Sequence, residues 1–341
     1  MDIQLLGITV LWVFLYGYMI VASIDFGAGF FSYYSVLTGK KHIIHGIIER
    51  YLSPVWEVTN VFLVFFLIGM VGFFPESAYY FGTTLLIPGC LAILLLCIRG
   101  SYYAFSTYGS KDNRFYMLLY GASGLLIPAS LSTVLTISEG GFIEVTDGKV
   151  SLMYLRLLSN PYSWSVVLLA LVSVLYISAM FLTYYASKAR DYAALEVVRI
   201  YAISWSVPTI FASLLVFFSI SKHNLVHFQR MADLSWLFAL SLLCFLLALY
   251  FVWRRIYYGW AFILVMLQFA LAFFGYGASH LPYILYPYIQ LYDHFTSPAM
   301  ATALVVAFIA GLMLLIPSLY LIMRLFLFNT KYVQGTKGKE K

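Results

Sequence analysis

Residues 47–74 read IIERYLSPVWEVTNVFLVFFLIGMVGFF, an apolar run that contains the carboxylate of Glu57. A membrane-spanning helix needs about 20 predominantly apolar residues, and this run is long enough. A charge at the centre of a bilayer costs from about 3 to more than about 10 kcal/mol, so an acid in such a run is a candidate functional group. The stretch therefore predicts a spanning helix with a polar site inside it.

The composition places the whole chain among membrane proteins. Its 341 residues are 63% hydrophobic and only 10% charged, whereas soluble domains carry roughly 25% charged residues. The long apolar runs favour helices over the alternating segments of about ten residues that form a transmembrane barrel. The net charge of +6 is scattered over loops rather than gathered on one face, which argues against a nucleic-acid partner.

Nine apolar runs predict an all-α polytopic membrane protein with about nine transmembrane helices. The runs are 5–31, 47–74, 78–105, 115–137, 162–185, 200–220, 234–253, 260–277 and 299–328. We expect two four-helix membrane bundles, at residues 1–137 and 161–280, separated by an extracytoplasmic loop at 138–160. An outer segment rich in Tyr and Pro and the ninth helix fill 281–328, and 329–341 form a basic cytoplasmic tail.

The extracytoplasmic loop carries turn signals. Gly140-Gly141 and Asp147-Gly148 stand on either side of the short apolar stretch 142–145. Such dipeptides are typical of tight turns, so the loop is predicted to form a small hairpin.

The positions of Lys and Arg predict the orientation of the helices. Fifteen of the 20 lie in loops and the tail on one side, and Arg99 lies inside the third run. The remaining four, on the other side, are Lys149, Arg156, Lys222 and Arg230. Because cytoplasmic loops carry the excess of Lys and Arg, the N-terminus is predicted outside and the C-terminus in the cytoplasm.

Five residues in the first three runs form a candidate site. Asp25, Glu57 and Arg99 all fall in the cytoplasmic halves of consecutive runs, and Thr59 and Asn60 follow Glu57 closely. One interpretation is a structural ion pair of Arg99 with Glu57 or Asp25, because an intramembrane charge needs a partner. The other is a proton pathway through Glu57, Asp25, Thr59 and Asn60, since burial raises the pKa of a carboxyl group. The two interpretations are compatible.

No catalytic residue, cofactor-binding residue or metal site is predicted in this chain. The histidines, at 42, 45, 223, 227, 280 and 294, fall outside the middle of the runs, where an axial heme ligand would lie. His223 and His227 have the i, i+4 spacing of a metal pair, but Lys222 and Arg230 flank them, so we predict no metal there. Cys90, Cys97 and Cys244 lack paired spacing and are interpreted as core residues.

Several short motifs, in order along the chain, resemble those of subunit II of the cytochrome bd-type quinol oxidases. They lie at 24–29 (IDFGAG), 54–62 (PVWEVTNVF), Arg99, 158–162 (LSNPY), 277–284 and 291–297 (LYDHFTS). Glu57 stands where the family pattern has Asp, and Phe62 stands where it has a second Trp. Glu keeps a titratable group, one methylene farther from the backbone.

The resemblance implies a heme-free subunit II of a bd-type quinol:dioxygen oxidoreductase, a terminal oxidase of the respiratory chain in the bacterial cytoplasmic membrane. The chain would form a heterodimer with the heme-bearing subunit I, which would carry heme b, heme d and the catalytic redox centres. A quinol would donate the electrons. A small single-span accessory subunit, lipid and quinone are further partners, and Asp25 and Glu57 match acids proposed to take up protons from the cytoplasm.

A secondary transporter is the alternative, with Asp25, Glu57 and Arg99 binding a substrate or coupling ion. Transporters often have broken helices at corresponding places in two related halves. Here no mid-span charge in the second half corresponds to those three residues. A partner that contains heme would favour the oxidase, and a solitary protein that moves a solute would favour the transporter.

Overall fold

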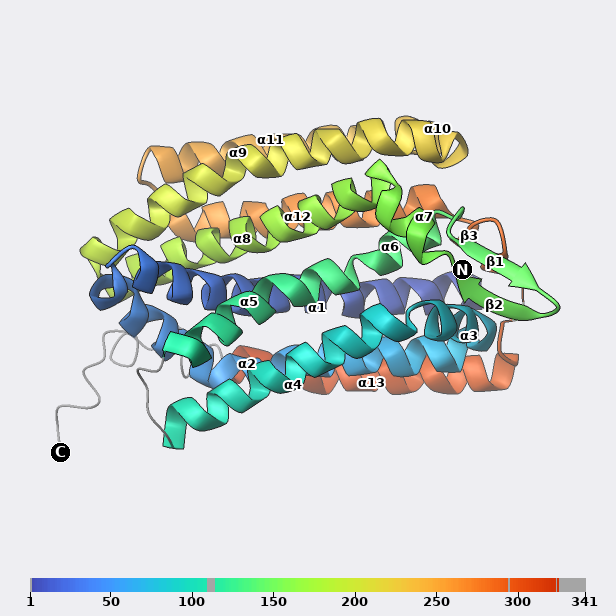
Figure 1. The fold of residues 1–341 in the computed structure, drawn as a ribbon, viewed down its shortest axis with the longest axis horizontal. Helices are drawn as coiled ribbons and strands as arrows, with labels where there is room; N and C mark the ends of the chain where they lie inside the picture. The colour runs from blue at the N-terminus through green and yellow to red at the C-terminus, as the bar shows by residue number, and fades with distance from the viewer. Residues whose placement is uncertain (1, 109–113, 294, 323, 325–341) are drawn as a thin grey trace.

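The chain folds into an elongated bundle whose helices run largely along its long axis (Figure 1). The computed structural model describes residues 2–108, 114–293, 295–322 and 324, without the side chains of 41, 45, 49–58 and 103–108. The helices are α1 (Ile3–Leu37), α2 (Lys41–Phe73), α3 (Pro75–Thr84), α4 (Leu86–Tyr108), α5 (Arg114–Leu131), α6 (Thr133–Ser138), α7 (Tyr154–Ser159), α8 (Pro161–Ala189), α9 (Tyr192–His223), α10 (Leu225–Asp233), α11 (Ser235–Trp253), α12 (Tyr258–His280) and α13 (Pro298–Ile322).

Seven helical segments among the described residues are long and apolar enough to cross a membrane. They are α1, α5 with α6, α8, α9, α11, α12 and α13. The run 78–105, predicted as one spanning helix, is divided between α3 and α4, which meet at an angle of 80°. Counting that bent pair as one span gives eight. In α2 the described apolar part is Thr59–Phe73, so a total of nine spans stays a prediction.

Two short antiparallel hairpins lie at one end of the bundle, which we call the hairpin end (Figure 1). Strands β1 (Ile143–Thr146) and β2 (Lys149–Leu152) pair around Asp147 and Gly148, whose φ angles are 52° and 74°. Two positive φ angles are what a two-residue hairpin turn requires, and the predicted hairpin is confirmed. The second hairpin, β3 (Tyr283–Leu285) with β4 (Ile289–Gln290), was not predicted.

Helices from both halves of the chain share the core. Helix α1 packs against α2 and α5, and also against α8 from the second half. One buried cluster joins Ile24 of α1 to Tyr176 of α8 and Phe245 of α11. A second joins Phe14 of α1 to Phe308 of α13, with ring centroids 5.4 Å apart. The boundary between two four-helix bundles stays a prediction.

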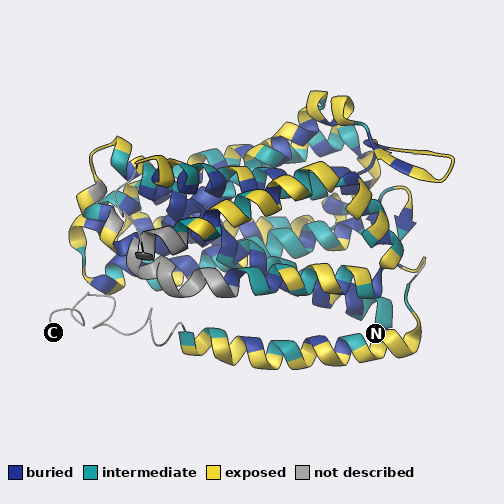
Figure 2. Ribbon diagram, turned by 60° about the horizontal axis from the view of Figure 1, so that its bottom comes forward, coloured by how far each residue is buried: buried dark blue, intermediate teal, exposed yellow. Residues whose placement is uncertain are grey.

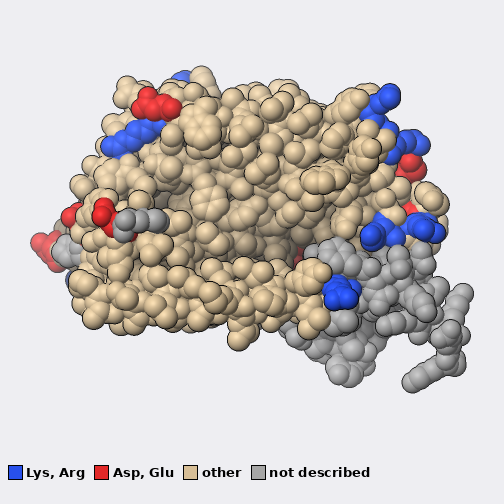
Figure 3. Space-filling view, turned by 180° about the vertical axis from the view of Figure 1, so that it is seen from behind, with Lys and Arg blue, Asp and Glu red and all other residues tan. Residues whose placement is uncertain are grey.

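The surface fits a protein surrounded by lipid. Helix α13 lies along one edge with most of its residues exposed (Figure 2), and those include Val306, Met313 and Leu314. On the face seen in Figure 3, charged side chains gather toward the two ends and leave a broad uncharged band between them. Apolar side chains cost no free energy against hydrocarbon, so the exposed helix faces are consistent with a membrane location.

Candidate functional site

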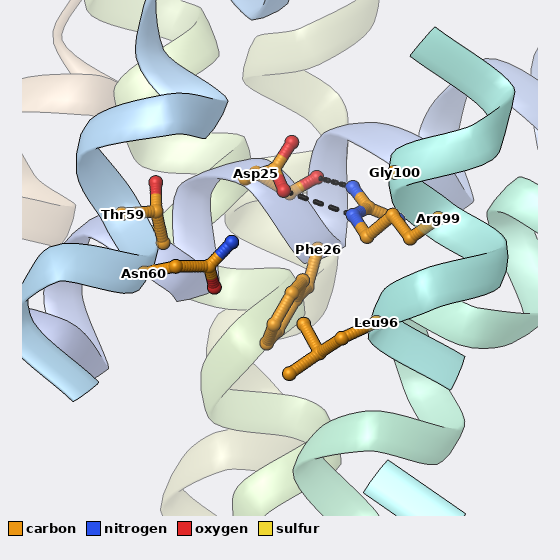
Figure 4. Close-up of a pocket in the computed structure, with 7 residues that line it drawn as sticks. All are labelled: Asp25, Phe26, Thr59, Asn60, Leu96, Arg99 and Gly100. Atoms are coloured by element: carbon orange, nitrogen blue, oxygen red, sulfur yellow. Dashed lines mark hydrogen bonds and ion pairs between the residues drawn. The ribbon is translucent and has the colours of Figure 1, made fainter. Parts of the chain in front are cut away.

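The candidate site lies between α1, α2, α4 and α5. Asp25 comes 22 residues after Ile3 and 12 before Leu37 in α1, or about 33 Å and about 18 Å along a helix. The site is therefore nearer to the end of the bundle opposite the hairpin end. Helix α2 brings Thr59 and Asn60 to one side of Asp25, and α4 brings Arg99 to the other (Figure 4).

Arg99 binds both the side chain and the backbone of Asp25. Its Nε donates to Asp25 Oδ2 at 2.9 Å, and its Nη2 donates to the Asp25 carbonyl oxygen at 2.5 Å. Its Nη1 donates to the carbonyl oxygen of Tyr120 at 3.0 Å, and its guanidinium lies 4.0 Å from the centre of the Tyr120 ring. The side chains of Arg99 and Asp25 are only 3% and 6% exposed. A buried charge pair with these hydrogen bonds is a firm link between α1 and α4.

Glycines in α1 make room for this packing. A Cβ at Gly29 would lie 2.9 Å from Arg99 Nη1 and from Tyr120 Cε1. A Cβ at Gly27 would lie 2.3 Å from the Cβ of Ser178 in α8, whose hydroxyl donates to the Ile24 carbonyl oxygen at 2.9 Å. The segment 24–29 thus lets α8 approach on one side and the Arg99 guanidinium on the other, as small residues do between membrane helices.

A small cavity adjoins the ion pair. It is lined by Asp25, Phe26, Thr59, Asn60, Leu96, Arg99 and Gly100, and it holds about one water-sized molecule. Three of the four residues predicted for a proton pathway therefore line one cavity, and the fourth, Glu57, has its side chain outside the described part of the structure. Of the two ion pairs that the sequence left open, the structure contains the one between Arg99 and Asp25.

A second buried polar cluster, at the hairpin end, was not predicted. Glu139, directly after α6, is only 2% exposed. Its Oε1 lies 2.7 Å from Nδ1 of His227 in α10 and 3.4 Å from Nδ1 of His280 at the end of α12. Burial opposes ionisation of this carboxyl group, but its hydrogen bonds with the two histidines hold the pKa of Glu139 well below its ordinary value.

The neighbours of this cluster hold its members in place. Asn224 donates from Nδ2 to Glu139 Oε2 at 3.0 Å, and the Tyr276 hydroxyl donates to Glu139 Oε1. The other ring nitrogen of His227, Nε2, lies 2.7 Å from the hydroxyl of Ser279. The side chains described here around Glu139 all come from the second half of the chain.

The i, i+4 spacing of His223 and His227 does not place them on one helix face. Helix α9 ends at His223 and α10 begins at Leu225. The His223 ring stacks on Phe142 and Tyr162, at centroid distances of 5.1 and 4.9 Å. A usable sequence signal was that Glu139, His227 and His280 all follow the outer ends of predicted spans, and so belong to one side of the membrane.

Comparison with known proteins places the chain in a family. Residues 3–326 match the family model described as cytochrome bd terminal oxidase subunit II. The chain belongs to this family. It is therefore a subunit of a terminal oxidase, an oxidoreductase, and it has a subunit I as its partner.

Two known proteins are similar to this oxidase subunit II over nearly its full length, which agrees with the assignment. A Bacillus subtilis (strain 168) protein, provisionally named cytochrome bd menaquinol oxidase subunit II, is 33% identical over 340 residues, 97% of each chain. A chain in the structure of bd oxidase from Geobacillus thermodenitrificans is 56% identical, with a TM-score of 0.83. That match covers 96% of the present chain and 100% of the other. The comparisons give no support to the transporter alternative.

Proposed function

We propose that this subunit II carries no heme, that it supports the heme-bearing subunit I, and that the cavity beside Asp25 belongs to a proton-uptake route. The observation that carries the proposal is the gathering of Asp25, Thr59 and Asn60 around one water-sized cavity. The heme groups of the complex, when bound in subunit I, supply the electron transfer to dioxygen. The residues of this chain would hold and move protons.

The positions of the histidines support the heme-free part of the proposal. Heme in a helical bundle is held by an axial side chain, most often His. Within the described residues, His42 lies near the start of α2, and His223, His227 and His280 lie at the hairpin end. His227 and His280 face the same carboxylate oxygen of Glu139, which is not the arrangement of two axial ligands on opposite sides of a macrocycle.

The ion pair supports a division of labour among the acids. Asp25 is held by Arg99 and by the Tyr120 hydroxyl, which donates to Asp25 Oδ1 at 3.3 Å. An anion stabilised in this way keeps the cavity polar and oriented, and it favours a water molecule that bridges to Thr59 and Asn60. Glu57 is the proposed carrier that exchanges a proton, because it is the remaining acid of the predicted pathway.

The remaining parts of the proposal concern place and partners. The excess of Lys and Arg supports a cytoplasmic location for the end opposite the hairpin end, so the cavity would take protons from that side. The chain would act in the bacterial cytoplasmic membrane, with menaquinol or another quinol as the electron donor of the complex and a small third subunit as a further partner. The name of the Bacillus subtilis relative supports a menaquinol donor.

The variant Asn60→Leu tests the role of the cavity. Leucine has the same number and branching of side-chain heavy atoms as asparagine but cannot hydrogen-bond water, so quinol-driven oxygen consumption of the purified complex should fall about tenfold or more. The exposed hairpin variant Glu144→Gln is the control and should keep wild-type turnover. A visible spectrum of each complex, and of this subunit alone, reports heme. Heme in the isolated subunit would overturn the heme-free role, and full turnover of Asn60→Leu would overturn the route through the cavity.

A further inference from the structure

The cluster at the hairpin end has a composition that the proton route does not explain. Glu139, His227 and His280 are 2%, 3% and 8% exposed. Their ligand atoms, one carboxylate oxygen and two ring nitrogens, lie within 4.8 Å of one another. They come from three separate segments, the end of α6, helix α10 and the end of α12.

We propose that Glu139, His227 and His280 form a binding site for one divalent transition-metal ion, and that the ion is Zn²⁺. Two imidazoles and one carboxylate are a common protein ligand set for zinc, which takes nitrogen and oxygen at about 2.0–2.2 Å. The borderline-soft imidazole nitrogens disfavour Mg²⁺ and Ca²⁺, which prefer all-oxygen sites. The short distance among the three donor atoms suits a single ion.

Two of the three distances among the donor atoms are close to those that a bound ion requires. In a tetrahedral site with bonds of about 2.0–2.1 Å, neighbouring ligand atoms are about 3.3 Å apart. Glu139 Oε1 and His280 Nδ1 already lie 3.4 Å apart. Glu139 Oε1 and His227 Nδ1 lie 2.7 Å apart, a hydrogen-bond distance. A shift of about 0.6 Å between these two side chains would bring their donor atoms to the spacing of two ligands of one zinc ion.

The surrounding hydrogen bonds match the outer shell of a metal site. A ligating histidine usually donates its second ring N–H to an oxygen, and a ligating carboxylate is itself hydrogen-bonded. His227 presents Nδ1 to the cluster and has Nε2 2.7 Å from the Ser279 hydroxyl. Glu139 presents Oε1 to the cluster, and its Oε2 accepts from Asn224 Nδ2 at 3.0 Å. Each of these two ligands is thus held through the atom that would not bind the ion.

A fourth ligand is available beside the three. The hydroxyl of Tyr276, which donates to Glu139 Oε1, lies where it can contact the ion or a water bound to it. Structural zinc sites use four ligands, and Tyr276 or a water bound beside it would take the fourth position. Because the site ties α6, α10 and α12 together, we assign the ion a structural role in holding the hairpin end.

Metal analysis of the intact oxidase complex tests the proposal. The complex is purified from cells grown with added Zn²⁺ and is then desalted. Its zinc content is measured by mass spectrometry, and the concentration of the complex is measured from the heme spectrum. Wild type should retain about one zinc per complex, and Glu139→Gln and His280→Ala should each lose it about tenfold or more. His223→Gln is the matched control, since His223 is half-buried at the same end but its ring stacks on Phe142 and Tyr162. It should keep its zinc.

Two results would overturn the proposal. One is a wild-type complex that holds less than about a tenth of a zinc after growth and incubation with Zn²⁺. The other is zinc that persists unchanged in Glu139→Gln and His280→Ala. If neither variant assembles with heme, the test rests on the wild-type complex. Its cryo-electron microscopy map must then contain density between the three side chains. Ordinary hydrogen-bond contacts without density would reject the site.

Discussion

Arg99 and Asp25 lie 74 positions apart in the chain and meet inside it, with Arg99 Nε 2.9 Å from Asp25 Oδ2. Taking two charges out of water is costly, and their attraction offsets this cost only where the remaining hydrogen bonds are also made. Here the carbonyl oxygens of Asp25 and Tyr120 accept the other guanidinium bonds. The pair therefore fixes α1 against α4. Removing either partner leaves the other as a buried charge without its counter-ion in apolar surroundings.

The variant Arg99→Met should destabilise the complex strongly. It strands the Asp25 carboxylate, and breaking a buried pair in this way costs about 3–5 kcal/mol. The control is Arg255→Gln, which removes an ion pair with Glu196 at 3.1 Å whose side chains are 60% and 43% exposed. That pair contributes about 0–1 kcal/mol. Thermal unfolding followed by size-exclusion fluorescence compares the two, and equal losses would contradict the account.

The variant Gly29→Ala should disturb the same ion pair without removing a charge. Its Cβ would lie 2.9 Å from Arg99 Nη1, and such overpacking costs about 1–3 kcal/mol. Gly89→Ala in α4 is the matched control, because a Cβ there meets nothing within 4 Å and alanine favours the helix by up to about 1 kcal/mol. Melting temperatures should move in opposite directions. A shift of the same sign and size in both variants would rule out the crowding argument.

Two asparagines cap helices at the hairpin end, and they should differ in their effect. Asn160 accepts from the Tyr162 N–H at 2.8 Å and caps α8, so Asn160→Ala should cost about 1 kcal/mol. Asn224 accepts from the His227 N–H at 3.1 Å and also donates to the buried Glu139 carboxylate. Asn224→Ala should therefore cost about 1.5–3 kcal/mol more. Chemical denaturation of both variants measures the difference, and a larger loss for Asn160→Ala would contradict it.

Cysteine labelling tests the proposed orientation. Lys40 lies in the loop between α1 and α2, and Lys149 lies on the hairpin of β1 and β2; both are exposed. In a background without the native cysteines, Lys149→Cys should react with a membrane-impermeant maleimide on intact cells. Lys40→Cys should react only in inverted vesicles. The reversed pattern would place the cavity beside Asp25 on the wrong side for uptake from the cytoplasm.

Local sequence signals predicted the features that depend on nearest neighbours. Asp147-Gly148 predicted a hairpin because two positive φ angles favour those residue types, and the pairing of Thr146 with Lys149 confirms it. Apolar runs predicted the helices because hydrocarbon demands a fully bonded backbone. The 80° bend between α3 and α4 was not predicted. Hydropathy shows which residues are apolar, but it does not show where the path of the backbone turns.

Contacts between residues far apart in the chain could not be predicted from the spacing of residues in the sequence. The sequence left Arg99 with two acidic partners, and only the packing of α1 against α5 and of α4 against α5 brings Asp25 to it. His227 was considered together with His223 because the two are four positions apart, but the break at Asn224 ends one helix and starts another. Its actual partner, Glu139, is 88 positions away, and no periodicity links residues that far apart.

The most direct test of the proposed proton route is quinol-driven oxygen consumption by the purified Glu57→Gln complex, with heme content measured on the same sample. Glutamine keeps the size and loses the titratable proton, so turnover should fall about tenfold or more while the heme spectrum stays unchanged. Glu57→Asp keeps a carboxyl group and should retain most of the activity. Normal turnover of Glu57→Gln with full heme would contradict the proposed proton route. This subunit would then only support subunit I.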